Sequence, residues 1–459
     1  MLWVLVYPDT HISSLVAVAM KQCLNVCLSL LCMSLVLGNA GLFHFTMICM
    51  NPENSTIPDK VYTTFEESYI VSSVAVGRLI GSMPTISLMN KAGLRITFTI
   101  FGFISGFATL CMPLFPANLY FACFIRVLQG ASQTSVYVAH GAIPLAWGGV
   151  KQQGRLVSVL SCCYEFSPML SMALSGLFCT SSFGWPGVYY LFGVTTISCF
   201  VVFFLVYTDV PKHKIAPRVD SNEVTLCSFK PHQVKKIPDV IPYKAIFSTP
   251  SVWGIFMTAL GDAVGYAMFV IYGPVYMNKV LHYQVTTTGL LTAYPFLISI
   301  FAKSLGGLLL DKIHWISHHA KVISFTAFAQ GAMTTCFLVL TFITAKNYVT
   351  AQVIFTLTVV FSGLHCVGEF STSQTVAYNY NHIITTVISV ENGLTALFLP
   401  TIVAFINPDQ NAHEWAKVFY GIVGVLVVTN IAYLALTKVK PAKWTNAEMN
   451  EKNEETSQA

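Results

Sequence analysis

The chain has 459 residues, of which 54% are hydrophobic and only 10% are charged. A soluble protein of this length carries nearer a quarter of charged residues, so the composition indicates an integral membrane protein. The formal net charge of +5 is small, and no basic face exists outside the segments between apolar runs, which argues against nucleic-acid binding.

Thirteen cysteines occur along the chain, and most of them lie inside apolar runs. They form no Cys-x-x-Cys set with histidines, so we expect no metal site among them. We interpret them as small apolar packing residues rather than as a disulfide framework. The N-terminus has no basic segment ahead of its apolar residues, so we do not predict a cleaved signal peptide.

Apolar stretches of membrane-spanning length recur about twelve times. They lie near 23–49, 68–89, 95–115, 119–145, 156–179, 186–208, 251–277, 285–310, 320–344, 348–371, 383–406 and 415–437. Each is close to the ~20 residues that a helix needs to cross ~30 Å of hydrocarbon. The sequence therefore predicts an all-α polytopic membrane protein with about 12 transmembrane helices.

The segments between the spans predict the orientation. Lysine and arginine concentrate at the N-terminal flank, in alternate turns, in the central segment and in the tail, so both termini should be cytoplasmic. The loop 51–67 lies on the opposite side and is acidic. It contains the chain's only glycosylation sequon, Asn54-Ser55-Thr56, so we expect a glycoprotein modified at Asn54.

The long polar stretch 209–248 divides the spans into two sets of six. It is rich in proline and mixed in charge, and we interpret it as a cytoplasmic linker between an N-terminal bundle (1–208) and a C-terminal bundle (249–437). The tail 438–459 is rich in acids and asparagine and should be disordered. Two six-helix halves joined by a linker are the plan of a transporter built from repeats.

The fourth predicted span carries a polar stripe. Arg126, Gln129, Gln133, Tyr137 and His140 fall within about 80° of the circumference of one helix. Lipid cannot solvate such a stripe, so it should face a water-filled path or a polar partner.

Several motifs resemble those of one transporter family. The segment 124–130 (FIRVLQG) is the most specific, and 184–193 (GWPGVYYLFG) and 242–253 (PYKAIFSTPSVW) are further matches. The turn 306–312 (GGLLLDK) resembles the Gly-x-x-x-Asp-(Arg/Lys) loop of the major facilitator superfamily. Over nearly the whole chain the sequence resembles the anion/cation symporter family of that superfamily, which includes vesicular glutamate transporters, sialin and sodium–phosphate cotransporters.

This resemblance implies a secondary active transporter of a small anion, either inorganic phosphate or an organic carboxylate. Transport would proceed by alternating access and be coupled to protons, sodium or the membrane potential. The chain has no nucleotide-binding fingerprint and no catalytic constellation, so we expect neither an enzyme nor a cofactor. Its partners would be the anion, the coupling ion and the lipid bilayer. The alternative is a non-transporting membrane sensor or scaffold that retains the fold.

Three departures from the family leave the substrate and the coupling ion open. Gln133 stands where the family usually has an acid, and no arginine occurs in the first span. Asp262 stands where the glutamate carriers have an arginine.

The predicted site lies among polar residues inside the spans. The substrate-binding candidates are Arg126, Gln129, Gln133, Tyr137, Asp262 and Tyr266. The fork of Arg126 can hold a carboxylate or phosphate in bidentate fashion, and the resemblance implies the same role. Alternatively, Arg126 neutralises Glu165 or Asp262 and locks the bundle.

The coupling and gating candidates are drawn from the same spans. Glu165 could supply the proton-binding acid that is missing at Gln133, or it could form a static pair with Arg126 or Arg78. His365 and Glu369 share a helix face at i, i+4 and could relay protons or satisfy each other. The gating candidates are His140, Asp311 and Lys312, and we expect Lys303 to extend toward the helix end near Asp311.

Overall fold

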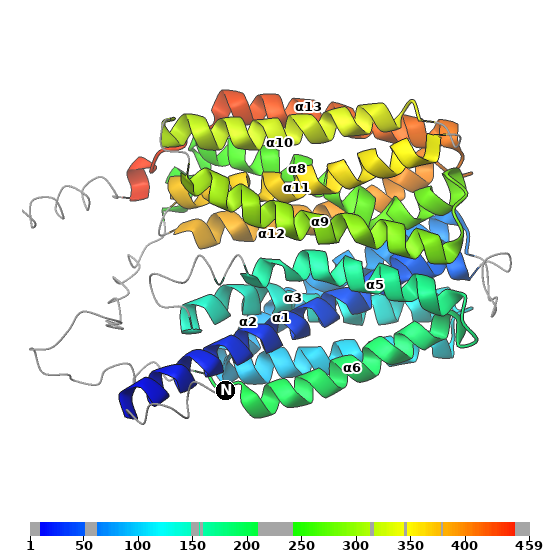
Figure 1. Cartoon of the computed structure of the whole chain (residues 1–459), viewed down its shortest axis with the longest axis horizontal. Coiled ribbons are helices and arrows are strands. Elements are labelled where there is room, and N and C mark those ends of the chain that lie inside the picture. The colour runs from blue at the N-terminus through cyan, green and yellow to red at the C-terminus, as the bar shows by residue number, and fades with distance from the viewer. Residues whose placement is uncertain are drawn as a thin grey trace, which may run out of the picture.

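The computed structural model describes residues 10–50, 62–147, 156, 159–209, 242–312, 316–343, 347–377 and 380–445. The regular secondary structure in these ranges is helical, and Figure 1 shows the long helices side by side along one axis. Ten segments are long and apolar enough to cross a membrane. The prediction of an all-α polytopic protein is therefore confirmed. The sequon at Asn54 lies outside the described residues, as does most of the predicted linker.

The helices form two groups. The first comprises α1 (Thr10–Cys49), α2 (Thr64–Cys111), α3 (Leu119–Trp147), α5 (Cys163–Cys179) and α6 (Gly184–Val206). The second comprises α8 (Pro250–Val275) with its π-helical extension η2 (Tyr276–Val280), α9 (Val285–Lys312), α10 (His318–Leu340), α11 (Tyr348–Ala377), α12 (Asn381–Ile406) and α13 (Ala412–Leu436). Three short helices lie between or after these elements. They are η1 (Met112–Leu114) after α2, α7 (Tyr243–Phe247) before α8, and η5 (Lys443–Thr445) after α13. Figure 1 shows the first group below the second.

Helix α2 contains two of the predicted spans, Thr64–Met89 and Lys91–Leu114. Gly93 separates them with a φ of +80°, a left-handed conformation that favours glycine. The carboxylate of Asp209, just beyond α6, accepts a hydrogen bond from the Arg95 amide at 3.2 Å and so ties this kink to the end of α6. With α3, which carries the polar stripe, and α5, which has 17 residues, the ten apolar segments make up the predicted twelve helices.

The two groups touch closely at the end of the bundle where α5 ends and α9 begins. Gly176 on α5 and Gly289 on α9 face each other without side chains, and a Cβ on either would lie 2.8 Å from the other's Cα. The hydroxyls of Thr180 and Thr286 are hydrogen-bonded across the same contact at 2.9 Å. This end of the bundle is therefore closed between the two groups.

The start of the predicted disordered tail is packed rather than free. The Val439 amide donates to His319 Nδ1 at 3.0 Å, and Trp444 Nε1 donates to Thr249 Oγ1 at 2.9 Å. Trp444 also packs edge-on against Tyr380, with ring centroids 5.6 Å apart. The expectation of disorder is wrong for residues 438–445, because Val439 and Trp444 contact residues of the second helix group. The acid-rich composition of the tail as a whole did not indicate these contacts. Residues 446–459 lie outside the described chain.

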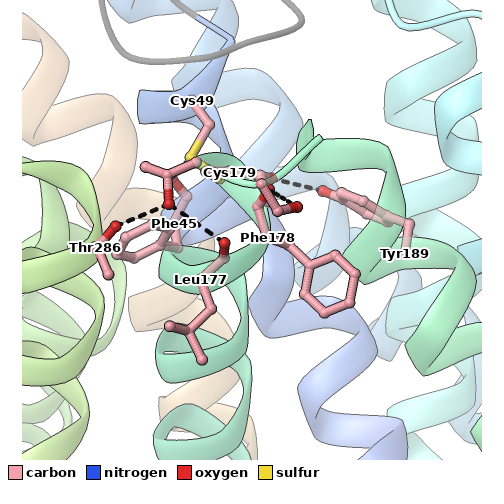
Figure 2. The surroundings of a disulfide bond; sticks show 10 residues. Phe45, Cys49, Leu177, Phe178, Cys179, Tyr189 and Thr286 are labelled. Carbon is pink, nitrogen blue, oxygen red and sulfur yellow. Dashed lines mark hydrogen bonds between the residues drawn. A yellow bond between two sulfur atoms is a disulfide. The ribbon is translucent and has the colours of Figure 1, made fainter. Parts of the chain in front are cut away.

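A disulfide bond joins Cys49 at the end of α1 to Cys179 at the end of α5. Figure 2 shows it beside Tyr189 of α6, with Thr286 of α9 across the neighbouring contact. The interpretation of all the cysteines as packing residues is wrong for this pair. The two are separated by 130 residues in sequence, and each ends an apolar run, so composition alone did not distinguish them.

We expect the double replacement of Cys49 and Cys179 by alanine to lower the free energy of unfolding by about 2–5 kcal/mol, because the bond closes a long loop. A thermal melt of the purified protein measures the loss. The matched control replaces Cys23 and Cys27, which are exposed and free, and should leave the melting temperature nearly unchanged. Alkylation without a reductant, read by peptide mass spectrometry, must leave Cys49 and Cys179 unlabelled; labelling of both would contradict the bond.

Candidate functional site

The polar stripe on α3 faces the neighbouring helices of its own group. Arg126 is 1% exposed, and its Nη1 donates to the backbone oxygen of Ala40 on α1 and to Gln129 Oε1 at 3.0 Å. Its Nε lies 3.4 Å from the backbone oxygen of Ile70 on α2, and its guanidinium lies 5.5 Å from the ring centroid of Phe43. These partners are neutral, so they hold the arginine in place without cancelling its charge.

One nitrogen of the Arg126 guanidinium makes no hydrogen bond to the described residues. Arg126 Nη2 is buried and has no hydrogen-bond partner among the described residues. A buried donor without a partner costs about 1–3 kcal/mol, and more when the group is charged. The alternative in which Arg126 pairs with Glu165 or Asp262 is not what the structure shows, because both acids have other partners.

A second arginine, Arg78, is hydrogen-bonded to Gln133 of the stripe. Gln133 Oε1 accepts a hydrogen bond of 2.6 Å from Nε of Arg78, which lies half-buried on α2. An acid at position 133 would neutralise this arginine, whereas the amide leaves its charge uncompensated. Neither Arg78 nor Arg126 forms an ion pair with a carboxylate in the part of the chain that the structure describes. On α1, the buried Nδ1 of His44 also has no hydrogen-bond partner among the described residues.

Aromatic side chains continue the stripe toward the second group. Tyr164 packs against Tyr137, with ring centroids 6.1 Å apart, and against His140 at 6.0 Å. Tyr266 of α8 donates its hydroxyl to the backbone oxygen of Tyr164 at 2.8 Å. The predicted residues Tyr137, His140 and Tyr266 are thus brought together around Tyr164, which the sequence did not single out.

Glu165 does not pair with either arginine. Its carboxylate forms an ion pair with Lys303 of α9, so the contact links the two groups of helices. The Lys303 side chain is 12% exposed and that of Glu165 is 4% exposed, which makes this a largely desolvated pair. The expectation that Lys303 extends toward the end of its helix is wrong, since a partner 138 residues away holds it inside the bundle.

The remaining candidates form an acidic cluster in the second group. Asp262 on α8 accepts a hydrogen bond of 2.7 Å from Ser362 on α11. His365 Nδ1 lies 3.7 Å from Asp262 Oδ1 and 3.9 Å from Glu369 Oε2. His365 and Glu369 lie on one helix face, as their spacing predicts, but Asp262 lies with them and not with Arg126. The side chains of Asp311 and Lys312, at the end of α9, lie outside the described part.

Comparisons with known proteins address the whole chain. The profile of the Major Facilitator Superfamily matches residues 12–397. A mouse protein named sodium-dependent phosphate transport protein 1 is 25% identical over 452 residues, covering 95% of this chain and 93% of its own. A mouse protein named probable small intestine urate exporter is 24% identical over 399 residues, covering 85% and 80%.

Solved structures share the fold. A D-xylose–proton symporter matches with a TM-score of 0.66 at 13% identity, covering 91% of this chain and 98% of its own. A bacterial homologue of the human lysosomal transporter Spinster, inward-facing and unoccupied, matches with a TM-score of 0.66 at 13% identity, covering 91% and 97%. At this level of identity these structures support the architecture alone.

Proposed function

Because the chain belongs to the Major Facilitator Superfamily, as an integral multi-pass membrane protein of its anion/cation symporter type, we propose that it transports a small anion by alternating access. Inorganic phosphate and organic carboxylates are the proposed substrates. The relatives reported above are named as a sodium-dependent phosphate transport protein and a probable urate exporter, and these names do not favour the alternative of a non-transporting sensor or scaffold.

The observation that carries the proposal is that neither of two arginines forms an ion pair with a carboxylate in the described part of the chain. Arg126 offers a free, buried Nη2, and Arg78 is held by the neutral Gln133. A buried positive charge in a membrane protein needs an anion or a water path, and guanidinium groups bind carboxylate and phosphate oxygens well. Gln129 and Gln133 would orient the arginines. Tyr137 and Tyr266 would contact the body of an organic anion.

We propose that the closed end, with the disulfide, faces away from the cytoplasm. Disulfides persist in oxidising compartments, so the Cys49–Cys179 bond supports this orientation. The distribution of lysine and arginine supports it independently. His140 and the pair Asp311 and Lys312 would then act at the cytoplasmic gate. Both termini would be cytoplasmic.

The coupling ion is a proton or sodium, or the membrane potential drives transport. For protons we propose Glu165, His365 and Glu369 as carriers. Protonation of Glu165 would remove the charge that holds Lys303 and so release a contact between the two helix groups. Coupling through a contact between the halves is suited to alternating access, since the halves must move relative to one another.

Counterflow with purified protein in liposomes tests the function. Liposomes loaded with phosphate, urate or a panel of carboxylates should accumulate the matching labelled anion, and Arg78→Gln should reduce the rate at least about tenfold. No counterflow with any anion under proton, sodium and voltage gradients would reject transport. Counterflow that Arg78→Gln and Arg126→Gln both leave unchanged would reject the site while keeping the transporter.

A further inference from the structure

Asp262, His365 and Glu369 place three ligating atoms around one point inside the second helix group. The atoms are Asp262 Oδ1, His365 Nδ1 and a Glu369 carboxylate oxygen, and all lie within 4.8 Å of one another. His365 is 0% exposed and Glu369 is 8% exposed. The cluster joins α8 to α11, and among the described residues no hydrogen bond or ion pair links it to Arg78 or Arg126.

A chain of hydrogen bonds determines which ring nitrogen of His365 carries the proton. Thr429 Oγ1 donates to the Val425 backbone oxygen, so it accepts from Gln330 Nε2 at 2.7 Å. Gln330 therefore presents Oε1 to Thr258, whose hydroxyl donates to it at 2.7 Å. With its proton used in this way, Thr258 Oγ1 accepts from His365 Nε2 at 2.8 Å. A neutral imidazole carries one proton, so Nδ1 presents a lone pair to the carboxylates.

Three electron-rich atoms thus meet, and the hydrogen-bond donor to them among the described residues is the Ser362 hydroxyl, which bonds Asp262 Oδ1 at 2.7 Å. His365 Nδ1 is buried and has no hydrogen-bond partner among the described residues. Its distances of 3.7 and 3.9 Å to the carboxylate oxygens exceed hydrogen-bond length, so a proton on Nδ1 would not bridge the atoms as they stand. A positive species of larger radius would relieve the repulsion among them.

The spacing selects the size of that species. The three ligating atoms are separated by 3.7 Å, 3.9 Å and at most 4.8 Å. Hard cations bind carboxylate oxygens at about 2.3–2.6 Å and can reach all three atoms, whereas two zinc bonds of about 2.0–2.2 Å do not span the largest separation. We propose that Asp262, Glu369 and His365 bind a hard metal cation of the size of Na⁺ or Ca²⁺. The Ser362 hydroxyl, which donates to Asp262 Oδ1 at 2.7 Å, holds this carboxylate in the cluster.

The charge of Lys303 does not compensate the carboxylates of this cluster. Lys303 acts on Asp262 from α9, but it already pairs with Glu165, so together these two contribute no net charge. This cation site rests on the transporter proposed above, and the two ions then bind in different halves. The anion binds at the arginines of α2 and α3, and the cation binds between α8 and α11.

Cation-dependent stability of the purified full chain tests the site without any anion substrate. Against choline chloride at equal ionic strength, NaCl or CaCl₂ should raise the melting temperature by at least about 2 °C. The salt that acts identifies the ion. Asp262→Asn and Glu369→Gln should abolish the rise, and the matched Glu67→Gln, at the closed end of the bundle, should keep it. An equal rise in all four proteins would overturn the proposal.

Direct binding covers the case in which a variant fails to fold. Wild-type protein should bind ²²Na⁺ or ⁴⁵Ca²⁺ saturably in a scintillation proximity assay, and Asp262→Glu, which keeps the charge, should retain binding with an affinity at least about threefold weaker. Absence of saturable binding of both ions to the wild type would overturn the site. Anion counterflow that persists in that case leaves the transport proposal standing, so the two failures are distinguishable.

Discussion

Gln133→Glu is expected to weaken anion binding at least about tenfold, although it changes only one amide to a carboxylate of the same shape. The new charge would lie 2.6 Å from Arg78 Nε and would form a charge-assisted pair with it. Close charge pairs have coupling energies of about 1.5–7 kcal/mol, and about 1.4 kcal/mol is already tenfold in affinity. The substrate would have to compete with a carboxylate that is permanently in place.

The KM for counterflow and the Kd from anion-dependent thermal shifts measure this loss. Gln284→Glu is the control, since Gln284 is exposed between η2 and α9 and the variant makes the same chemical change away from the arginines. The amount of folded protein after size-exclusion chromatography should be equal for both variants. An unchanged KM in Gln133→Glu would mean that Arg78 does not contact the anion.

The polar stripe could be predicted from the sequence because it depends on periodicity within one helix. Arg126, Gln129 and Gln133 are confirmed as buried neighbours on α3, and the i, i+4 pair of His365 and Glu369 is equally local. Both follow from 3.6 residues per turn, which needs no knowledge of how helices pack.

Partners on other helices could not be predicted in this way. Lys303 meets Glu165 across 138 residues, and Cys49 meets Cys179 across 130. Such contacts depend on the rotation and depth at which helices pack, which apolar composition does not specify. A signal did exist for Arg78, since an intramembrane arginine without a local partner and a missing acid at Gln133 together point to an unneutralised charge.

Glu165→Gln is expected to lower the free energy of unfolding by about 3–5 kcal/mol, the usual loss when one partner of a buried ion pair is removed. The Lys303 ammonium would remain in a largely desolvated place with its counter-charge gone. Lys303→Met should be damaging for the same reason, because it leaves the Glu165 carboxylate buried and alone. The double variant should recover most of the loss, since it removes both charges together.

Thermal melts of the two single variants and the double variant form a cycle that isolates the interaction. Glu391→Gln, at a partly buried glutamate of α12 without an ion-pair partner among the described residues, is the matched control and should shift stability by less than about 1 kcal/mol. Additive losses in the double variant would show that the pair is not coupled.

The same cycle addresses mechanism, because the neutral amide introduced by Glu165→Gln mimics a protonated acid. If Glu165 carries the coupled proton, the folded double variant should still exchange anions but no longer respond to a pH gradient. Since Glu165 and Lys303 are the charged contact between the two groups of helices in the part of the chain that the structure describes, that loss would connect proton binding to their relative movement.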